Sequence, residues 1–225
     1  MSRRSLLAHG ANDGMTELMQ ASQVGNLERV QILVERGDDV NAARTTDGMT
    51  ALMCASKNNH LNVVGFLVNA EADVNAIKTD TGATALILAI DIHRLDAESE
   101  INRFNIARIL VDKGADVNAR KTDTGSTPLM MAIYWRHYDI ANLLVDSGAN
   151  INAVNNENNT ALNYLNTRPH SDIHEVQPLR NKILELLNAK GAMMNQRKSL
   201  KGGARKKTQI KKKKRTCKKR KTRRN

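Results

Sequence analysis

The sequence predicts an all-α protein, a solenoid of helix–turn–helix repeats followed by a disordered basic tail. Three observations support this prediction: one short string recurs five times in register, an apolar helical stripe follows each copy, and charge is divided unevenly between two regions. Only six of the 225 residues are aromatic. The core is therefore expected to consist of Leu, Val, Ile, Met and Ala, which suits small, closely packed helices.

The recurring string begins with threonine and predicts the first helix of each repeat. Its pattern is T-x-L, followed in the first four copies by x-x-A, and successive copies are 34, 34, 43 and 33 residues apart. The threonine hydroxyl can accept a hydrogen bond from a free N–H of the first turn, which caps the helix. The copies begin at Thr16, Thr50, Thr84, Thr127 and Thr160.

A second helix is predicted after each string, because apolar residues follow at the i, i+3, i+4 spacing of one buried stripe. In four repeats a glycine ends this helix, where a left-handed C-cap is expected; these are Gly37, Gly114, Gly148 and Gly191. A loop of the type Asp-Val-Asn-Ala follows in the first four repeats. The stripes are Val30/Leu33/Val34, Val64/Leu67/Val68, Ala107/Leu110/Val111, Ala141/Leu144/Val145 and Leu184/Leu187.

These residues resemble the ankyrin repeat, with its period near 33, its Thr-Pro-Leu-His-x-Ala signature and its Gly-Ala-Asp-Val-Asn-Ala close. The resemblance implies a curved stack of helix pairs with β-turn fingers, in which neighbouring repeats complete each other's core. It also implies a concave face made of finger tips and first helices. The expected domains are an N-terminal extension over 1–12, an ankyrin-repeat domain over 13–194 with repeats 13–42, 47–76, 81–119, 124–153 and 157–194, and a disordered tail over 195–225.

Several positions depart from the family pattern. Glu71 stands where other repeats have glycine, which costs about 1 kcal/mol if that residue is left-handed, so repeat two is expected to be the softest. Nine extra residues around 93–105 are expected to lengthen the hairpin of repeat three, and Leu165 with an extension near 168–178 is typical of a terminal capping repeat. The family's Thr–His hydrogen bond is expected to be absent, because the signature histidine is replaced by Met19, Met53, Ile87, Met130 and Asn163.

Residues at the finger tips form one candidate surface for a protein partner, because the family resemblance places recognition there. The alternative interpretation is that they are simply soluble turns. The tips comprise 44–47, 78–80, 120–123 and 155–157, and the candidates chosen from them are Lys78, Asp80, Arg120, Lys121 and Asp123.

An aromatic cluster in repeat four is a second candidate. Tyr134, Trp135 and Tyr138 fall within five residues, with Arg136 among them, and Trp, Tyr and Arg are the residues that most often dominate interface energetics. Tyr134 and Trp135 align with a polar pair in repeat two, which predicts exposure. The alternative is that Trp135 packs under the extended hairpin of repeat three.

No residue pattern indicates catalysis, so we expect a protein that is not an enzyme and has no cofactor. The Asp and Asn of the loops recur in nearly every repeat, which favours a structural role, whereas a catalytic group occurs once. The segment of His170, His174 and Glu175 has a metal-like spacing, because two histidines four residues apart could face one ion if the segment were helical. No third ligand is evident near this pair of histidines and two prolines crowd the segment, so no metal site is expected.

Composition indicates an intracellular protein that does not enter a membrane. The longest clean apolar run, residues 85–90, is far short of the ~18–20 residues that cross a bilayer. The N-terminal apolar stretch is too short for a signal-peptide core. Cys54 lies in a predicted helix and Cys217 in a basic run, so a disulfide framework is not expected and a reducing compartment fits.

Residues 197–225 contain 17 Lys and Arg and no acid, whereas the first 196 residues carry 18 basic and 23 acidic residues. Such a run of like charge is expected to be disordered. Nuclear import, non-specific nucleic-acid binding and attraction to anionic lipid all remain open, the last being the least favoured. Gly-Gly followed by Lys and Arg is loosely similar to tails on proteins of large DNA viruses, which carry many ankyrin proteins. The candidate targeting residues are Lys211, Lys212, Lys213, Lys214, Arg215, Lys218, Lys219, Arg220 and Lys221.

Two functions are therefore predicted from the sequence. In the first, a monomeric solenoid binds a protein partner on its concave face and the tail directs it to the nucleus. In the second, the tail is the active part, and the protein is a nucleic-acid or chromatin-associated factor.

Overall fold

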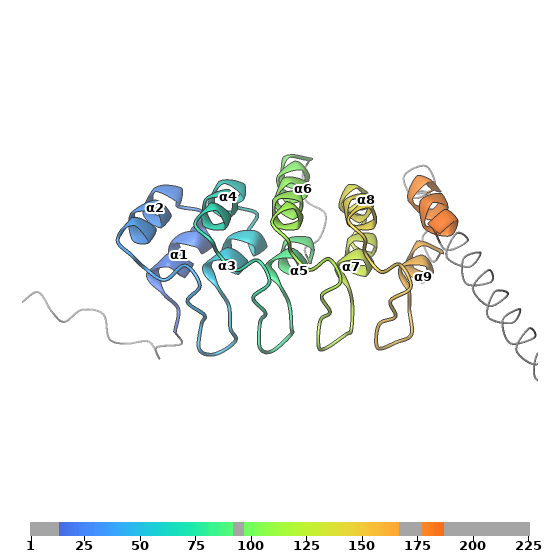
Figure 1. Cartoon of the computed structure of the whole chain (residues 1–225), viewed down its shortest axis with the longest axis horizontal. Helices are drawn as coiled ribbons and strands as arrows, with labels where there is room; N and C mark the ends of the chain where they lie inside the picture. The colour runs from blue at the N-terminus through green and yellow to red at the C-terminus, as the bar shows by residue number, and fades with distance from the viewer. Residues whose placement is uncertain (1–13, 92–96, 167–176, 187–225) are drawn as a thin grey trace, which may run out of the picture. The chain divides into compact units, whose positions relative to one another are not determined.

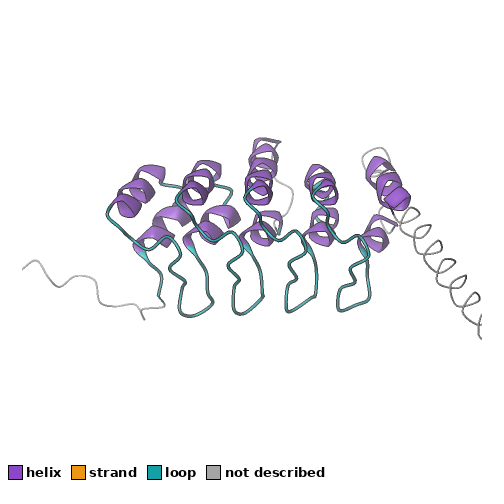
Figure 2. Cartoon of the chain, in the orientation of Figure 1, coloured by secondary structure: helices purple, strands orange, loops and turns teal. Residues whose placement is uncertain are grey.

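The structure is a computed structural model, and it describes residues 14–91, 97–166 and 177–186. The chain divides into two compact units, Met1–Leu179 and Arg180–Asn225. The described residues are helices and connecting loops, with no strand among them (Figure 2). This confirms the all-α fold expected from the repeat pattern.

The helices of the first unit form two rows, with the loops projecting as fingers beyond the row of first helices (Figure 1). Each helix packs against the next one in its row, and each first helix packs against the second helix of its own repeat where both are described. The first row is α1 (Glu17–Val24), α3 (Ala51–Lys57), α5 (Ala85–Ile90), α7 (Pro128–Tyr134) and α9 (Ala161–Asn166), and the second is α2 (Leu27–Glu35), α4 (Leu61–Asn69), α6 (Ala97–Asp112) and α8 (Tyr138–Asp146).

The signature string builds both the cap and the core of each first helix. As predicted, the hydroxyls of Thr16, Thr50 and Thr127 accept hydrogen bonds from the backbone N–H three residues on, at 3.1, 3.3 and 3.4 Å. The leucine two positions after each threonine is buried in the first four repeats, as is the following alanine. Neighbouring helices therefore meet through small and branched apolar side chains, as the composition indicates.

Repeat five has a threonine–asparagine hydrogen bond at the position of the family's Thr–His bond. The Thr160 hydroxyl donates to the Asn163 side-chain oxygen at 2.6 Å and accepts from the Asn163 backbone N–H at 3.3 Å. The Asn163 amide thus occupies the position of the family's histidine and provides an equivalent hydrogen bond.

Residues in the left-handed conformation end the second helices. Gly37, Gly114 and Gly148 have φ of 93°, 86° and 86°, and Glu71 stands at the equivalent place with φ of 63°. Glu71 therefore meets the condition under which the sequence predicts a cost at this position. A side chain there is strained by about 1 kcal/mol relative to glycine.

Repeat three differs from the prediction of a longer hairpin. Helix α6 has 16 residues, whereas α2, α4 and α8 have nine each, so much of the insertion extends the second helix; residues 92–96 of the connection lie outside the described residues. The added turns reach the neighbouring repeat, where the Asn59 amide donates to the Ser99 carbonyl at 3.0 Å. An inserted sequence with helix-forming residues at 97–103 extends an existing helix because each added residue gains a backbone hydrogen bond.

A buried arginine closes this altered hairpin. In repeats two and four the backbone N–H of His60 or His137 donates to the carbonyl of Ala55 or Ala132, which closes the turn. In repeat three Arg103 Nη1 donates to the equivalent carbonyl of Ala89, at 2.7 Å, and the residue is 1% exposed. Burial lowers the pKa of Arg103, and the charge of Glu100 opposes that shift only in part.

Two ladders connect successive repeats on the finger side. The loop asparagines Asn41, Asn75 and Asn118 each accept, through the side-chain oxygen, a hydrogen bond from the backbone N–H of the next repeat at 2.7 Å. Along the fingers, Thr79, Thr122 and Asn156 each donate a backbone N–H to a carbonyl of the preceding finger at 2.8–2.9 Å. Adjacent fingers are thereby held in register.

The C-terminal part of the repeat region is described only in pieces. Residues 177–186 are helical, and Leu179 and Ile183 are buried, whereas Leu184 of the predicted stripe is half-buried. Leu187, Gly191, the N-terminal extension 1–12, the His170/His174/Glu175 group and the whole basic tail lie outside the described residues.

Candidate functional site

Lys78 and Asp80, the finger-tip candidates between repeats two and three, take part in an ion-pair network between fingers. The Lys78 ammonium lies 3.1 Å from Asp47 of the preceding finger and 3.2 Å from Asp80 of its own finger, and its side chain is only 14% exposed. Asp47 also pairs with Arg44 at 2.5 Å and accepts the Met49 backbone N–H at 3.1 Å. These charges are already engaged within the solenoid and hold two fingers together.

Arg120 likewise joins two fingers. Its Nη2 donates to the Val154 carbonyl of the next finger at 2.7 Å. The neighbouring Lys121 instead turns toward the helices, where its ammonium lies 3.4 Å from Asp91 and 3.5 Å from Asp123. Lys78 and Arg120 therefore join neighbouring fingers, whereas Lys121 faces a pocket beside the helices.

The aromatic cluster of repeat four is also divided by the structure. Tyr134 ends α7 and is 51% exposed, Trp135 is half-buried at the C-cap, and Arg136 occupies the turn with φ of 69°. Tyr138 is 8% exposed and begins α8, so its expected place in an exposed patch on the first helix is wrong. Tyr138 aligns with Leu27 and Leu61, two apolar residues that begin α2 and α4, a signal that could have predicted its burial.

A pocket of about 200 Å³ lies beside these aromatic residues, between the finger of repeat four and the first helices. We call it the aromatic pocket. Its walls come from three repeats: Asp91 from the end of α5, Lys121 and two small polar residues from the finger, Met130, Met131, Tyr134 and Trp135 from α7, and Tyr164 from α9. The pocket thus lies on the face that the family resemblance assigns to recognition.

Trp135 belongs to this pocket and does not simply fill the core. Its indole Nε1–H donates to Asp91 Oδ1 at 3.1 Å, and its ring meets Tyr134 edge-on, with centroids 4.8 Å apart and planes at 83°. Tyr134 in turn meets Tyr164 at 6.0 Å and 84°, and the Asn155 amide donates to the Tyr164 hydroxyl at 3.0 Å. Hydrogen bonds therefore anchor two of the three rings.

One carboxylate and one ammonium line the aromatic pocket, those of Asp91 and Lys121, which lie 3.4 Å apart. Lys121 also pairs with Asp123 of the finger, which lies outside the lining. Partial burial pushes the pKa of Asp123 upward, but the Thr124 backbone N–H and the Lys121 charge outweigh it and leave that pKa below its ordinary value. Lys121 therefore pairs with two carboxylates, one in the pocket wall and one on the finger.

Sequence reasoning identified Tyr134, Trp135 and Lys121 but missed Asp91 and Tyr164. Asp91 lies immediately before the insertion, 44 residues from Trp135 and 30 from Lys121, so only the packing of repeats brings the three together. Tyr164 is four residues after its repeat's threonine, in register with Met131 of the preceding repeat. The alignment of Tyr164 with Met131 was the sequence signal that could have placed it in the site.

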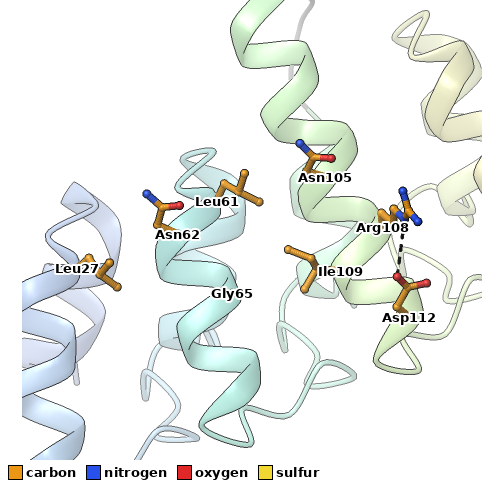
Figure 3. A pocket seen from close by; sticks show the side chains of 8 residues that line it. All are labelled: Leu27, Leu61, Asn62, Gly65, Asn105, Arg108, Ile109 and Asp112. Atoms are coloured by element: carbon orange, nitrogen blue, oxygen red, sulfur yellow. Dashed lines mark ion pairs between the residues drawn. The ribbon is translucent and has the colours of Figure 1, made fainter.

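A second, wider hollow of about 530 Å³ lies across the second helices α2, α4 and α6 (Figure 3). Its floor opens at Gly65, where the equivalent positions of other repeats carry longer side chains and an added Cβ would meet nothing within 4 Å. The charged residues at its rim, Arg108 and Asp112, are mostly exposed and pair with each other at 3.8 Å. It contains no buried charge or aromatic ring that would define a ligand.

Within residues 14–91, 97–166 and 177–186, no three His, Cys, Asp or Glu side chains come together as metal ligands. No helix in these ranges has the length and apolarity required to cross a bilayer. Cys54 is buried on α3, and burial raises the pKa of its thiol to about 11.

The stacked helix pairs, the capping threonines and the finger ladder define a repeat protein whose surface is suited to binding other macromolecules. A family model described as ankyrin repeats (3 copies) matches the chain at residues 18–97, 77–155 and 102–175. The chain therefore belongs to the ankyrin-repeat family, whose repeats generally mediate protein–protein interaction and are typically non-enzymatic. No curated protein was found to match the chain.

Proposed function

We propose that the protein is a non-enzymatic adaptor that binds a protein partner through the aromatic pocket and the adjoining finger surface, while its basic tail directs it to the nucleus. One observation carries the first part: three aromatic residues and the Asp91 carboxylate converge from three repeats on the finger side of the first helices. Residues that were needed only for folding would not have to leave Tyr134 half exposed. Partly exposed Trp and Tyr in a pocket are typical of interface hot spots.

Affinity capture from nuclease-treated lysate at about physiological salt tests this proposal. The full chain is compared with Trp135→Ala and with a control, Ile101→Ala, which removes an exposed apolar residue of α6 away from the pocket. We expect Trp135→Ala to weaken binding of the captured protein by about 1 kcal/mol or more, roughly fivefold, because a hot-spot contact is lost. The control is expected to bind as the unchanged chain does.

Thermal melting distinguishes a binding role of Trp135 from a packing role. A Trp135→Ala variant that melts many degrees lower yet captures the same protein equally well would show that this residue supports the core and not the interface.

The charge division supports a second candidate function, non-specific nucleic-acid binding by the tail. Seventeen basic residues without an acid in residues 197–225 can neutralise phosphates, and the lack of aromatics there leaves no means of base stacking. Binding through ~6–10 phosphates weakens by about 10³ to 10⁵ between 50 and 200 mM salt, far more than binding through a pocket.

A tail-neutralised full-length variant separates the two functions. It carries Gln at the basic positions from Lys211 to Arg215 and from Lys218 to Lys221. If this variant still captures the protein partner but no longer enters the nucleus, the adaptor proposal holds in both parts. If it captures nothing, and nuclease also abolishes capture by the unchanged chain, the tail is the principal binding element.

A further inference from the structure

The aromatic pocket has the dimensions of a site for one side chain. Its volume of about 200 Å³ is below the ~300–1,000 Å³ of pockets that enclose small-molecule ligands. A protein partner would therefore insert a single residue here and make its remaining contacts along the fingers. The chemistry of the walls then determines which residue is favoured.

The aromatic walls favour a cation. Tyr134 meets both Trp135 and Tyr164 with ring planes more than 80° apart, so the three rings form a corner instead of a flat stack. The face of an aromatic ring carries negative electrostatic potential, which attracts a guanidinium or ammonium group within about 6 Å. An apolar side chain would gain packing in the same corner but would leave the adjacent charges unused.

The Asp91 carboxylate strengthens this preference. Asp91 is held by the Trp135 indole at 3.1 Å and by Lys121 at 3.4 Å, one partner to each oxygen, while its side chain remains 30% exposed. A carboxylate offers about four lone-pair positions, so Asp91 can accept further hydrogen bonds without losing these two. An anionic ligand would be repelled by Asp91 and would have to compete with Asp91 and Asp123 for Lys121.

We propose that the aromatic pocket binds an Arg or Lys side chain of the protein partner, with the cationic group against Asp91 and its stem beside Tyr134 and Tyr164. This inference rests on the proposed function, because it identifies the chemistry of the partner at that same surface. Lys121 is then a restraint on affinity, since its ammonium competes with the incoming cation for Asp91.

Trp135 provides a specific probe, because it is the single tryptophan of the chain. The indole N–H resonance of the full chain would be followed by NMR during titration with N-acetyl-arginine amide and N-acetyl-lysine amide at constant ionic strength. N-acetyl-norleucine amide serves as the neutral probe of similar length, and N-acetyl-glutamate amide as the anionic one. We expect a saturable shift with the two cationic probes and none with the others.

Three variants test the assignment of individual residues. Asp91→Asn is expected to weaken the cationic probes at least about fivefold, because it removes the charge that the cation faces. Lys121→Gln is expected to strengthen them by a similar factor. Asp112→Asn, which removes a paired carboxylate on the outer face of α6, is the matched control and is expected to have no effect.

Four results would overturn the inference. Equal shifts with norleucine would define an apolar pocket, and stronger shifts with glutamate that Lys121→Gln abolishes would define an anion site. If the indole resonance moves on tail neutralisation before any probe is added, the occupant is the chain's own tail. Partner capture that requires Trp135 but is unchanged in Asp91→Asn would leave the proposed function standing while removing this inference.

Discussion

Repeats two and three begin alike and then diverge. Both have a threonine-capped first helix with a buried signature leucine and alanine. In repeat two the backbone N–H of His60 donates to the Ala55 carbonyl. In repeat three the Arg103 side chain donates to the equivalent carbonyl of Ala89, while residues 92–96 of the connection lie outside the described residues. The described part of the irregular repeat therefore adds a buried charged side chain at a carbonyl that receives a backbone donor in the regular repeat.

The fingers that follow repeats two and three differ in a comparable way. Lys78 and Lys121 occupy equivalent finger positions, yet Lys78 connects two fingers while Lys121 faces Asp91 at the end of α5. Asp91 lies just before the insertion. Regular repeats thus use their charges to hold the stack together, and the position where the pattern breaks provides a carboxylate to the aromatic pocket.

Removing the buried arginine is expected to have the largest effect on stability. Arg103→Ala leaves the Ala89 carbonyl without its donor and leaves a cavity beside α5, so the free energy of unfolding is expected to fall by about 2–4 kcal/mol. Urea unfolding followed by circular dichroism measures this change. Arg108→Ala, on the same helix but 63% exposed in its side chain, is the matched control and is expected to change stability by less than about 0.5 kcal/mol. Equal midpoints for the two variants would show that Arg103 does not stabilise the altered hairpin.

Substitution of Asp47, a carboxylate of the ion-pair network between fingers, is expected to have the next largest effect on stability. The Arg44 guanidinium, helped by the Met49 N–H and Lys78, holds the pKa of Asp47 well below its usual range despite opposing desolvation. Asp47→Asn is expected to lower the free energy of unfolding at pH 7 by about 1–3 kcal/mol.

The same depressed pKa predicts a pH dependence with a definite sign. Because the folded pKa of Asp47 lies below the unfolded value near 4, its stabilisation is complete above that pH and is lost as pH falls toward 2. The Asn variant should therefore show a flatter decline in unfolding free energy over this range. Asp91→Asn is expected to lose less than about 1 kcal/mol; an equal loss in both variants would contradict the distinction between finger network and pocket.

A reciprocal exchange of helix-ending residues gives the smallest predicted effect. Glu71→Gly is expected to stabilise repeat two by about 1 kcal/mol, because glycine adopts the left-handed conformation without strain. Gly114→Ala in repeat three should destabilise by a similar amount; an added Cβ there meets nothing within 4 Å, so only the backbone contributes. Melting curves of both variants measure the pair, and shifts of the same sign would show that the two helix ends are not equivalent.

Much of the fold could be predicted from the sequence because the same residue types recur at the same positions of each repeat. The threonine caps, the buried leucines and the left-handed helix ends, including Glu71, all follow from local rules applied at fixed spacing. The division of the insertion between connection and α6 did not follow. The distance between successive threonines shows how many residues are inserted, but not whether the inserted residues extend a helix.

The candidate site could be predicted only where its residues are neighbours in sequence. Tyr134 and Trp135 are adjacent and conspicuous, but Asp91 acquires its role through contacts across 44 and 30 residues. The tips were harder to assign, because a charged turn residue has the same sequence signal whether it is free to meet a partner or, like Arg120, bonded to the next finger.

Because the same asparagine contact joins each pair of successive loops, one repeat could be removed or added without changing how the loops connect. Each rung is the same contact, an asparagine side chain of one loop accepting from the backbone of the next, so removing one whole repeat would bring two compatible loops together and restore the rung. An insertion between the helices of a repeat does not pass through any rung, and repeat three carries its extra residues there. The protein can thus lengthen or elaborate one repeat while the spacing of its fingers stays constant.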